Sequence, residues 1–158
     1  MGLSEQEIQQ HIAAIDALSN PASPKYGRLL CWQNPWDPVW HYGIGLSDIA
    51  IFDTGQRRCP FERPSASVVT GLGEIALPPA KTIGRLKHAL WVFADWEYNF
   101  LGWNCEHLSR LIATDQPRCY QSRPLWWLAN LTPAGEHKTA HHVFQNYLSQ
   151  VAPELLPS

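Results

Sequence analysis

The chain has 158 residues, of which 45% are hydrophobic and 16% are charged, and it carries a formal net charge of −2. These values fit one globular domain and exclude an intrinsically disordered chain. They also exclude nucleic acid as the expected partner, because the chain has no excess of lysine and arginine with which to bind phosphates.

The first predicted element is a helix within residues 1–20. Ser4 is followed three residues later by Glu7, which is the pattern of a capping box at a helix start. Isoleucines then recur at helical spacing and form one apolar face: Ile8, Ile12 and Ile15. We expect this helix to pack on the domain through that face.

Short strands are predicted in the middle of the chain, where apolar runs are bounded by proline, glycine and asparagine. Three of them fall within residues 26–35, 39–46 and 49–55. Segment 57–67 contains two prolines and predicts a loop, and segment 67–79 predicts a further strand or a pair of strands.

After Pro79 the spacing of apolar residues changes from two to about 3.6, which predicts helices. These are expected within residues 82–98, 105–114 and 136–150, and Asn104 is a suitable N-cap for the second of them. Strands in the middle with helices around them predict an α+β fold, in which a small antiparallel sheet packs against helices.

Cys105 is the first candidate for chemistry, because it stands at the predicted start of a helix. The positive end of the helix dipole favours the thiolate form of a cysteine, which is the nucleophilic form. A cysteine in a helix is more often structural, so the position alone leaves both interpretations open.

A thiol nucleophile needs a base, and that base needs a third group to orient it. His41 lies in a predicted strand and shares one face of it with the small residues Gly43 and Gly45. Asp53 follows twelve residues later, at the end of the next predicted strand. A separation of twelve residues across two neighbouring strands allows the Asp53 carboxylate to reach the His41 imidazole, but it does not require this contact.

Segment 98–107, from Tyr98 through Asn-Cys-Glu-His, resembles the signature of the lecithin:retinol acyltransferase family, which includes the H-Ras-like suppressor phospholipases and acyltransferases. In that family this tetrapeptide opens a helix, with a tyrosine a few residues before it. The family's base histidine lies in a strand of the form His-aromatic-small-Ile, which is similar to residues 41–44 here. A second polar residue follows twelve positions later, where this chain has Asp53.

The resemblance implies a circularly permuted papain-like fold of the NlpC peptidase type. Carried over to this chain, it makes Cys105 the nucleophile, His41 the general base and acid, and Asp53 the residue that orients His41. The backbone N–H of Cys105 becomes an oxyanion donor, with Asn104 and Tyr42 as supporting residues of the motif. Asp53 departs from the family, which usually has a second histidine there, and this puts the substrate preference in doubt.

Together these predictions describe one domain over residues 1–158, with an N-terminal helix in 1–20, a catalytic core in 25–115 and a C-terminal extension in 116–158. The expected activity is that of an acyltransferase or phospholipase, acting on acyl esters, and most of all glycerolipids, through a cysteine thioester. A cysteine peptidase or amidase of the same fold is the alternative, and a non-catalytic module that binds lipid or protein is a third.

The remaining histidines and cysteines have structural interpretations. His137 and His141 have the i, i+4 spacing of zinc ligands, but no cysteine pair lies nearby, so neither a metal nor any other cofactor is predicted. His107 lies about 200° around the helix from Cys105 and is interpreted as structural. Three cysteines are expected to be inert: Cys31, Cys59 and Cys119.

With no predicted signal peptide or membrane span, we expect four free thiols and a cytoplasmic protein. Trp126 and Trp127, in the apolar segment 125–131, are the candidates for a peripheral membrane contact. Acyl lipid is the expected partner, and a protein partner is not predicted.

Overall fold

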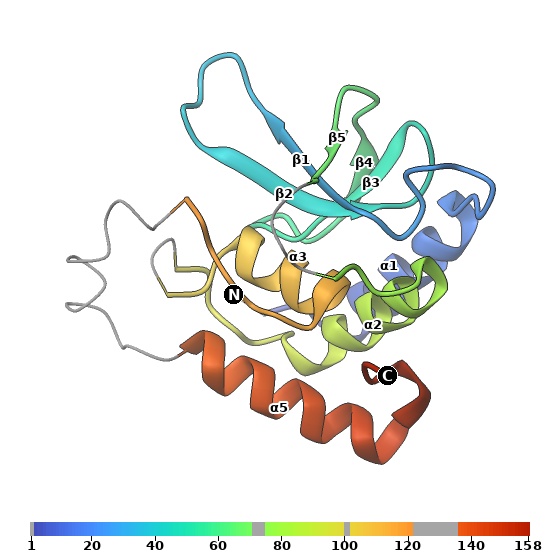
Figure 1. Cartoon of the computed structure of the whole chain (residues 1–158), viewed down its shortest axis with the longest axis vertical. Helices are drawn as coiled ribbons and strands as arrows, with labels where there is room; N and C mark the ends of the chain where they lie inside the picture. Colours follow the sequence, from blue (N-terminus) through green and yellow to red (C-terminus); the bar gives the residue numbers. More distant parts are fainter. Residues whose placement is uncertain (1, 71–74, 100–101, 122–135) are drawn as a thin grey trace.

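The computed structural model describes residues 2–70, 75–99, 102–121 and 136–158. Over these residues the fold is α+β, with one five-stranded antiparallel sheet in the order β4-β3-β2-β1-β5 and helices gathered on one side of it (Figure 1). The elements are α1 (Glu5–Leu18), β1 (Leu29–Gln33), β2 (Trp40–Gly45), β3 (Ala50–Asp53), β4 (Pro60–Glu62), β5 (Ser67–Val68), α2 (Pro79–Val92), α3 (Cys105–Thr114), α5 (Glu136–Val151) and the 3₁₀ turn η2 (Pro153–Leu155).

The capping box predicted for the first helix is confirmed. The Ser4 hydroxyl accepts the Glu7 N–H at 3.3 Å, and the Glu7 carboxylate accepts the Ser4 N–H at 2.8 Å. Ile8 and Ile15 are buried, so α1 packs through the predicted face, in contact with α2 and β4.

The three predicted central strands are present as β1, β2 and β3, joined as antiparallel neighbours. The loop predicted for segment 57–67 is wrong in part, because β4 forms within it and pairs Phe61 with Ile51. Proline at the start of an edge strand breaks no ladder bond, which is why Pro60 does not prevent this pairing. The strand predicted after residue 67 is present as β5, which is only two residues long.

α2 begins earlier and ends earlier than the spacing of apolar residues predicts. It starts at Pro79, because proline is tolerated in the first turn, where its missing N–H has no intrahelical acceptor. It ends at Val92, where a turn follows in which Trp96 donates its N–H to the Phe93 carbonyl at 3.1 Å.

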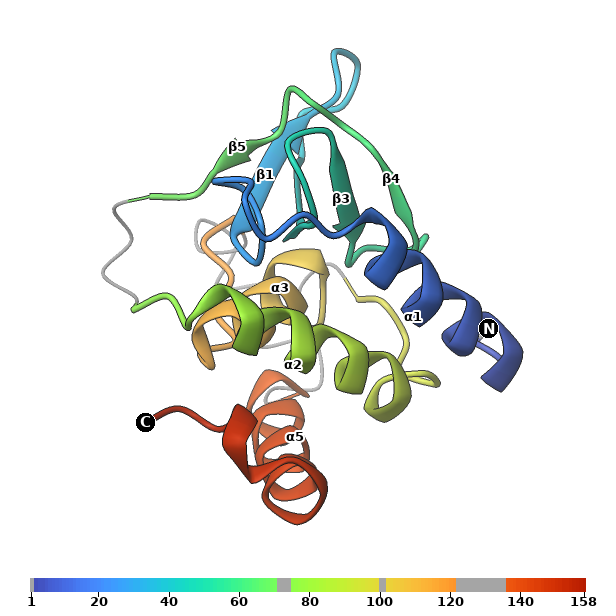
Figure 2. The same cartoon turned by 90° about the vertical axis from the view of Figure 1, so that its right-hand side faces the viewer.

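The sheet separates two apolar clusters. The main core lies between the sheet and the helices, where α3 contacts β2 and β1 and α2 contacts α3. A small cluster lies on the opposite face: Leu30, Trp32, Ile51 and Ala66. Figure 2 shows the resulting order of sheet, then α2 with α3, then α5.

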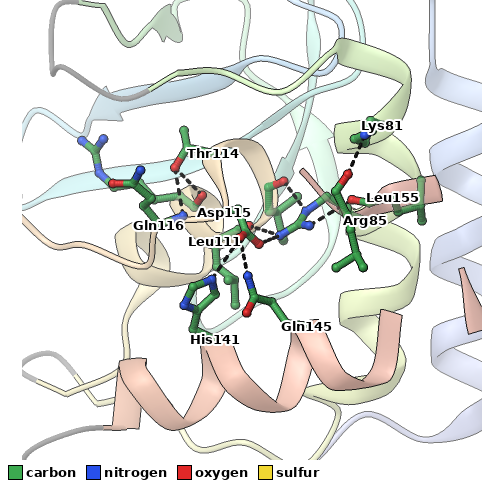
Figure 3. A network of polar contacts seen from close by, with 12 residues as sticks. Lys81, Arg85, Leu111, Thr114, Asp115, Gln116, His141, Gln145 and Leu155 are labelled. Atoms are coloured by element: carbon green, nitrogen blue, oxygen red, sulfur yellow. Dashed lines mark hydrogen bonds and ion pairs between the residues drawn. The ribbon is translucent and has the colours of Figure 1, made fainter. Parts of the chain in front are cut away.

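A buried ion pair joins the end of α3 to α2 and α5 (Figure 3). Arg85, fully buried on α2, contacts the carboxylate of Asp115 at 2.5 Å and also donates to carbonyl groups at the end of α3. Asp115 caps α3 in a left-handed conformation with φ 60°. Its second carboxylate oxygen contacts His141 at 3.0 Å and Gln145 at 2.8 Å, both on α5. This network fixes α5 against the rest of the domain.

None of the helices in the described part of the chain combines the length and the hydrophobicity that a bilayer-spanning segment requires.

Candidate active site

Cys105 is the first residue of α3, as the sequence predicts. The side chain of Asn104 caps the helix by accepting the N–H groups of Glu106 at 3.0 Å and His107 at 3.2 Å. Asn104 has an extended backbone, whereas Cys105 is already helical. The backbone N–H of Cys105 has no acceptor among the residues that the structure describes, which is usual for the first residue of a helix.

The thiol of Cys105 lies at an open edge of β2. The pairing of β2 with β3 begins only at Gly43, so Tyr42 and Trp40 precede the paired part. The backbone N–H of Tyr42 donates to the Cys105 sulfur. The Gln121 side-chain amide pairs with Trp40, accepting its N–H at 2.8 Å and donating to its carbonyl at 2.9 Å. Cys105 and Gln121 therefore take the place of a neighbouring strand along this edge.

Thr54 ties the edge of β2 to α3. Its buried hydroxyl lies 3.0 Å from the carbonyl oxygens of both Tyr42 and Cys105, and 2.5 Å from the hydroxyl of Ser109. One hydroxyl thus contacts a strand and two residues of a helix, so it sets the distance between them. Thr54 was not among the predicted site residues, because its partners are 12 to 55 positions away in the sequence.

Cys105 is only 3% exposed, and this burial raises the pKa of its thiol to about 12. The hydrogen bonds from the Tyr42 N–H and the Tyr98 hydroxyl lower the pKa, whereas the negative charge of Asp53 raises it. The prediction that the helix N-terminus favours the thiolate is therefore wrong for this arrangement, because burial outweighs the helix dipole. At neutral pH the sulfur carries its proton.

Tyr98 contacts the sulfur from the segment that precedes α3. Burial raises the pKa of its hydroxyl, and the nearby Cys105 raises it further. Tyr98 therefore stays protonated at neutral pH, so its hydroxyl can act as a donor toward the sulfur.

His41 lies on the opposite face of the sheet from the main core. It pairs with Trp32 across β1 and β2, and side chains directly opposite each other share a face. The two rings stack, with centroids 5.6 Å apart and planes inclined by 19°. The imidazole Nε2 lies 2.8 Å from the carboxylate of Asp37, and no hydrogen bond joins His41 to Cys105 among the described residues.

Asp53 lies at the end of β3, directly opposite Gly43. Its carboxylate accepts the Gly55 N–H at 2.7 Å. Burial raises the pKa of Asp53, while the backbone hydrogen bond and the proximity of His41 lower it. A methyl group added at Gly55 would lie 2.9 Å from the Asp53 carboxylate and 3.7 Å from the Cys105 Cβ. Asp53 thus stands near both predicted catalytic partners, without a hydrogen bond to either.

The two supporting residues of the motif have structural contacts. Asn104 caps α3 and points its amide nitrogen at the sulfur of Cys119, 3.2 Å away. Tyr42 is buried in the main core, where the guanidinium of Arg110 lies 5.7 Å from its ring centre. Its backbone N–H is therefore the part of Tyr42 that reaches the Cys105 thiol.

Cys119, which was expected to be inert, has its sulfur 3.2 Å from the carboxylate of Glu106 as well as beside Asn104. Glu106 is fully buried and forms an ion pair with Arg110 at 2.9 Å. Besides complementing the dipole at the start of α3, Glu106 therefore joins α3 to the segment that carries Cys119. Nothing in the spacing of these residues indicated that Cys119 returns to the start of α3.

The histidines of the C-terminal half form separate contacts. His107 is buried, accepts the Asn104 N–H on Nδ1 at 3.3 Å and stacks on Trp103, which agrees with a structural role. His137 stacks on His107, whereas His141 contacts Asp115. In the described ranges no three histidine, cysteine or acidic side chains are grouped closely enough to hold a metal ion.

All four cysteines are free thiols. The predicted membrane contact at Trp126 and Trp127 lies outside the described residues.

A comparison with models of protein families found no match, and comparisons with curated proteins and with solved structures found none either.

Proposed function

We propose that this protein is a thiol-dependent acyl enzyme, a phospholipase or an acyltransferase that acts on acyl esters such as glycerolipids. In this proposal Cys105 is the nucleophile and His41 the general base. The α+β fold agrees with this proposal, and the resemblance of the Asn-Cys-Glu-His segment to the lecithin:retinol acyltransferase family suggests a circularly permuted papain-like arrangement of the NlpC type.

One observation carries the proposal: hydrogen-bond donors surround the sulfur of Cys105. The Tyr42 backbone and the Tyr98 hydroxyl lie near enough to lower the pKa of its thiol, and the Cys105 N–H has no acceptor among the described residues. Donors fixed around a nucleophile stabilise a thiolate and then the oxyanion that forms when the thiolate attacks a carbonyl group. A purely structural cysteine has no need of them.

The reaction follows in two steps. In the first, the thiol proton moves to the His41 imidazole, the sulfur bonds to the acyl carbon, and the ester C–O bond breaks as the imidazolium returns the proton to the leaving oxygen. In the second, His41 takes a proton from water or from another acceptor, which attacks the acyl carbon of the thioester. The C–S bond breaks, and the imidazolium returns the proton to the sulfur. Water as acceptor gives a phospholipase, and an amine or alcohol gives an acyltransferase.

A non-catalytic module is the second candidate, and the burial of Cys105 is the observation that favours it. A thiol that is 3% exposed, with a pKa of about 12, is protonated and shielded at neutral pH. Catalysis therefore requires the substrate to bring the sulfur, His41 and the acyl carbon together, because hydrogen bonds at a catalytic site are often completed only when substrate binds.

Intact-mass spectrometry after incubation with mixed phospholipids tests the proposal. We expect one acyl adduct per chain that hydroxylamine removes, and we expect it to be absent from Cys105→Ala. Cys59→Ala is the matched control, because Cys59 is a half-buried free thiol to which the proposal gives no role, and this variant should acylate like the wild type.

Three results contradict the proposal in different ways. An adduct that persists in Cys105→Ala places the chemistry on another thiol. If no lipid forms an adduct but Cys105 reacts with a peptide thioester, the peptidase alternative is supported. No adduct with either substrate from a folded protein supports a binding module.

A further inference from the structure

We propose that Asp37, and not Asp53, is the positioning residue that orients His41; this inference rests on the proposed function in assigning His41 the role of base. Asp37 lies in the turn between β1 and β2, four residues before His41. Its carboxylate is the one that contacts the imidazole.

The contact fixes which nitrogen of the neutral ring carries the hydrogen. His41 Nε2 lies 2.8 Å from Asp37 Oδ2. An ionised carboxylate only accepts hydrogen bonds, so Nε2 must be the donor. The amide nitrogen of Asn34 lies 3.3 Å from the same Nε2. It cannot donate a hydrogen bond there, because a protonated Nε2 has no free lone pair. Nδ1 is therefore the unprotonated nitrogen, and it is the one that can accept a proton.

Asp37 is itself held in place. Its other oxygen accepts the Val39 N–H at 2.9 Å, and its own N–H donates to the Asn34 carbonyl at 3.1 Å. The hydrogen bond from Val39 lowers the pKa of Asp37, and the one from His41 lowers it further, so the carboxylate is ionised at neutral pH. The turn thus presents a fixed negative charge to the imidazole.

The ring of His41 is confined from a second direction. Trp32 stacks on it with planes only 19° apart, so rotation of the imidazole out of that plane is blocked on one side. The hydrogen bond at Nε2 and the stacking on Trp32 together restrict the imidazole to one orientation. This is what a general base needs before it receives a proton from sulfur.

Asp53 is less suited to the same task. Its carboxylate accepts the Gly55 N–H at 2.7 Å, and its burial disfavours the charged form. The nearby His41 lowers the pKa of Asp53, but no hydrogen bond joins the Asp53 carboxylate to the ring. Asp53 and Asp37 therefore make a matched pair of substitutions, since both carboxylates lie near His41 and only one contacts it.

The experiment measures the His41 tautomer by NMR of ¹⁵N-labelled imidazole in wild type, Asp37→Ala, Asp37→Glu and Asp53→Ala. We expect the wild type and Asp53→Ala to carry the hydrogen on Nε2, Asp37→Ala to show a mixture of tautomers, and Asp37→Glu to recover the Nε2–H form in part. In parallel, kcat/KM for acyl-ester turnover should fall roughly 10- to 100-fold in Asp37→Ala, less than when a serine enzyme loses its carboxylate, because a thiol depends less on its base.

An unchanged tautomer in Asp37→Ala overturns the inference, and so does a mixture of tautomers in Asp53→Ala alone. The NMR signal does not depend on turnover, which separates the two proposals. A tautomer change in Asp37→Ala with no turnover even in the wild type supports the positioning of the ring and overturns the proposed function. Normal turnover in a folded Asp37→Ala shows that the contact has no part in catalysis and overturns the inference as stated.

Discussion

His107 couples the start of α3 to pH. Burial, together with the smaller effect of the neighbouring His137, lowers the pKa of this histidine from the ordinary value of 6.5 to about 4. The folded state therefore holds His107 neutral, whereas the unfolded chain takes up a proton as the pH falls below 6.5. Stability is thus lost as the pH falls from about 6.5 to 4, by up to about 3 kcal/mol.

Urea unfolding of wild type and His107→Gln at pH 7 and at pH 4 measures this loss. Glutamine does not titrate, so we expect the variant to be less stable at pH 7 but to lose less stability on acidification. Equal losses in the two proteins would assign the acid sensitivity to other groups.

Single residues were predicted well where their partners are close in the sequence. Ser4 and Asn104 act as the expected caps, because an N-cap bonds to backbone groups two or three positions ahead. The burial of Cys105 depends on Tyr98 and on a strand more than fifty residues earlier, so no local pattern reveals it. The contact of Asp37 with His41 is short in sequence, but it depends on the shape of a turn that no periodicity describes.

At the scale of elements, the ion pair between Arg85 and Asp115 determines how α5 is attached. Both groups are buried, and removing one partner of such a pair leaves an uncompensated charge in the interior. We expect Arg85→Met to reduce the free energy of unfolding by about 3–5 kcal/mol, measured by urea denaturation. Lys87→Met is the matched control, because its ion pair with Asp16 is largely exposed and should contribute less than about 1 kcal/mol. Similar losses for both substitutions would contradict this account.

The turn between β1 and β2 carries the most exposed aromatic side chain among the described residues. Trp36 is 97% exposed and Trp40 is 44% exposed, in a turn that projects away from the helices (Figure 1). Tryptophan is favoured at lipid–water interfaces. If the substrate is a glycerolipid, this turn brings His41 to the surface on which the substrate lies.

We therefore expect Trp36→Ala to weaken binding to phosphatidylcholine vesicles about 10- to 100-fold in a flotation assay, since burying an aromatic side chain of this size contributes roughly 1.5–3 kcal/mol. Trp91→Ala is the control, because Trp91 is 39% exposed on α2 and lies outside this turn. Equal binding of both variants and the wild type would remove the turn from any membrane contact.

The boundaries of elements were predicted less well than their existence. α3 matches its predicted range, because the N-cap and the apolar spacing indicate the same start. α2 ends six residues before the predicted end at Tyr98, although the apolar spacing continues. After Val92 the chain still places aromatic side chains in the core: Phe93 is buried against Trp96 and Trp103, and such contacts mimic a helical pattern.

For the whole molecule, the sequence predicted the α+β class, and the structure adds the strand order. Alternation of apolar and polar residues identifies strands but not their neighbours, so the order β4-β3-β2-β1-β5 was not predicted. The register of these strands pairs the start of β2 with β1 and leaves it free on the β3 side, beside α3. It therefore determines where the Cys105 thiol lies, and with it the whole candidate site.

The order of the strands also determines how the protein behaves when many copies are crowded together. An open sheet ends in two edges whose free N–H and C=O groups can pair with another chain. Here β5 is two residues long, and β4 is three residues long and starts with proline. The two residues that flank β4, Cys59 and Arg63, form backbone hydrogen bonds toward β3, so the alternation of the strand turns the backbone groups of Pro60 and Glu62 toward the outer edge.

The outer edge of β4 thus offers a proline without an N–H and a charged glutamate, two features that oppose the pairing of one sheet with another. We expect concentrated Pro60→Val to scatter more light on gentle heating than the wild type, because valine restores the missing donor and favours strands. Glu62→Asp, which keeps the charge, should scatter like the wild type. The outer edge of β4 thus keeps the sheet that positions the Cys105 thiol from pairing edge to edge with the sheet of another copy.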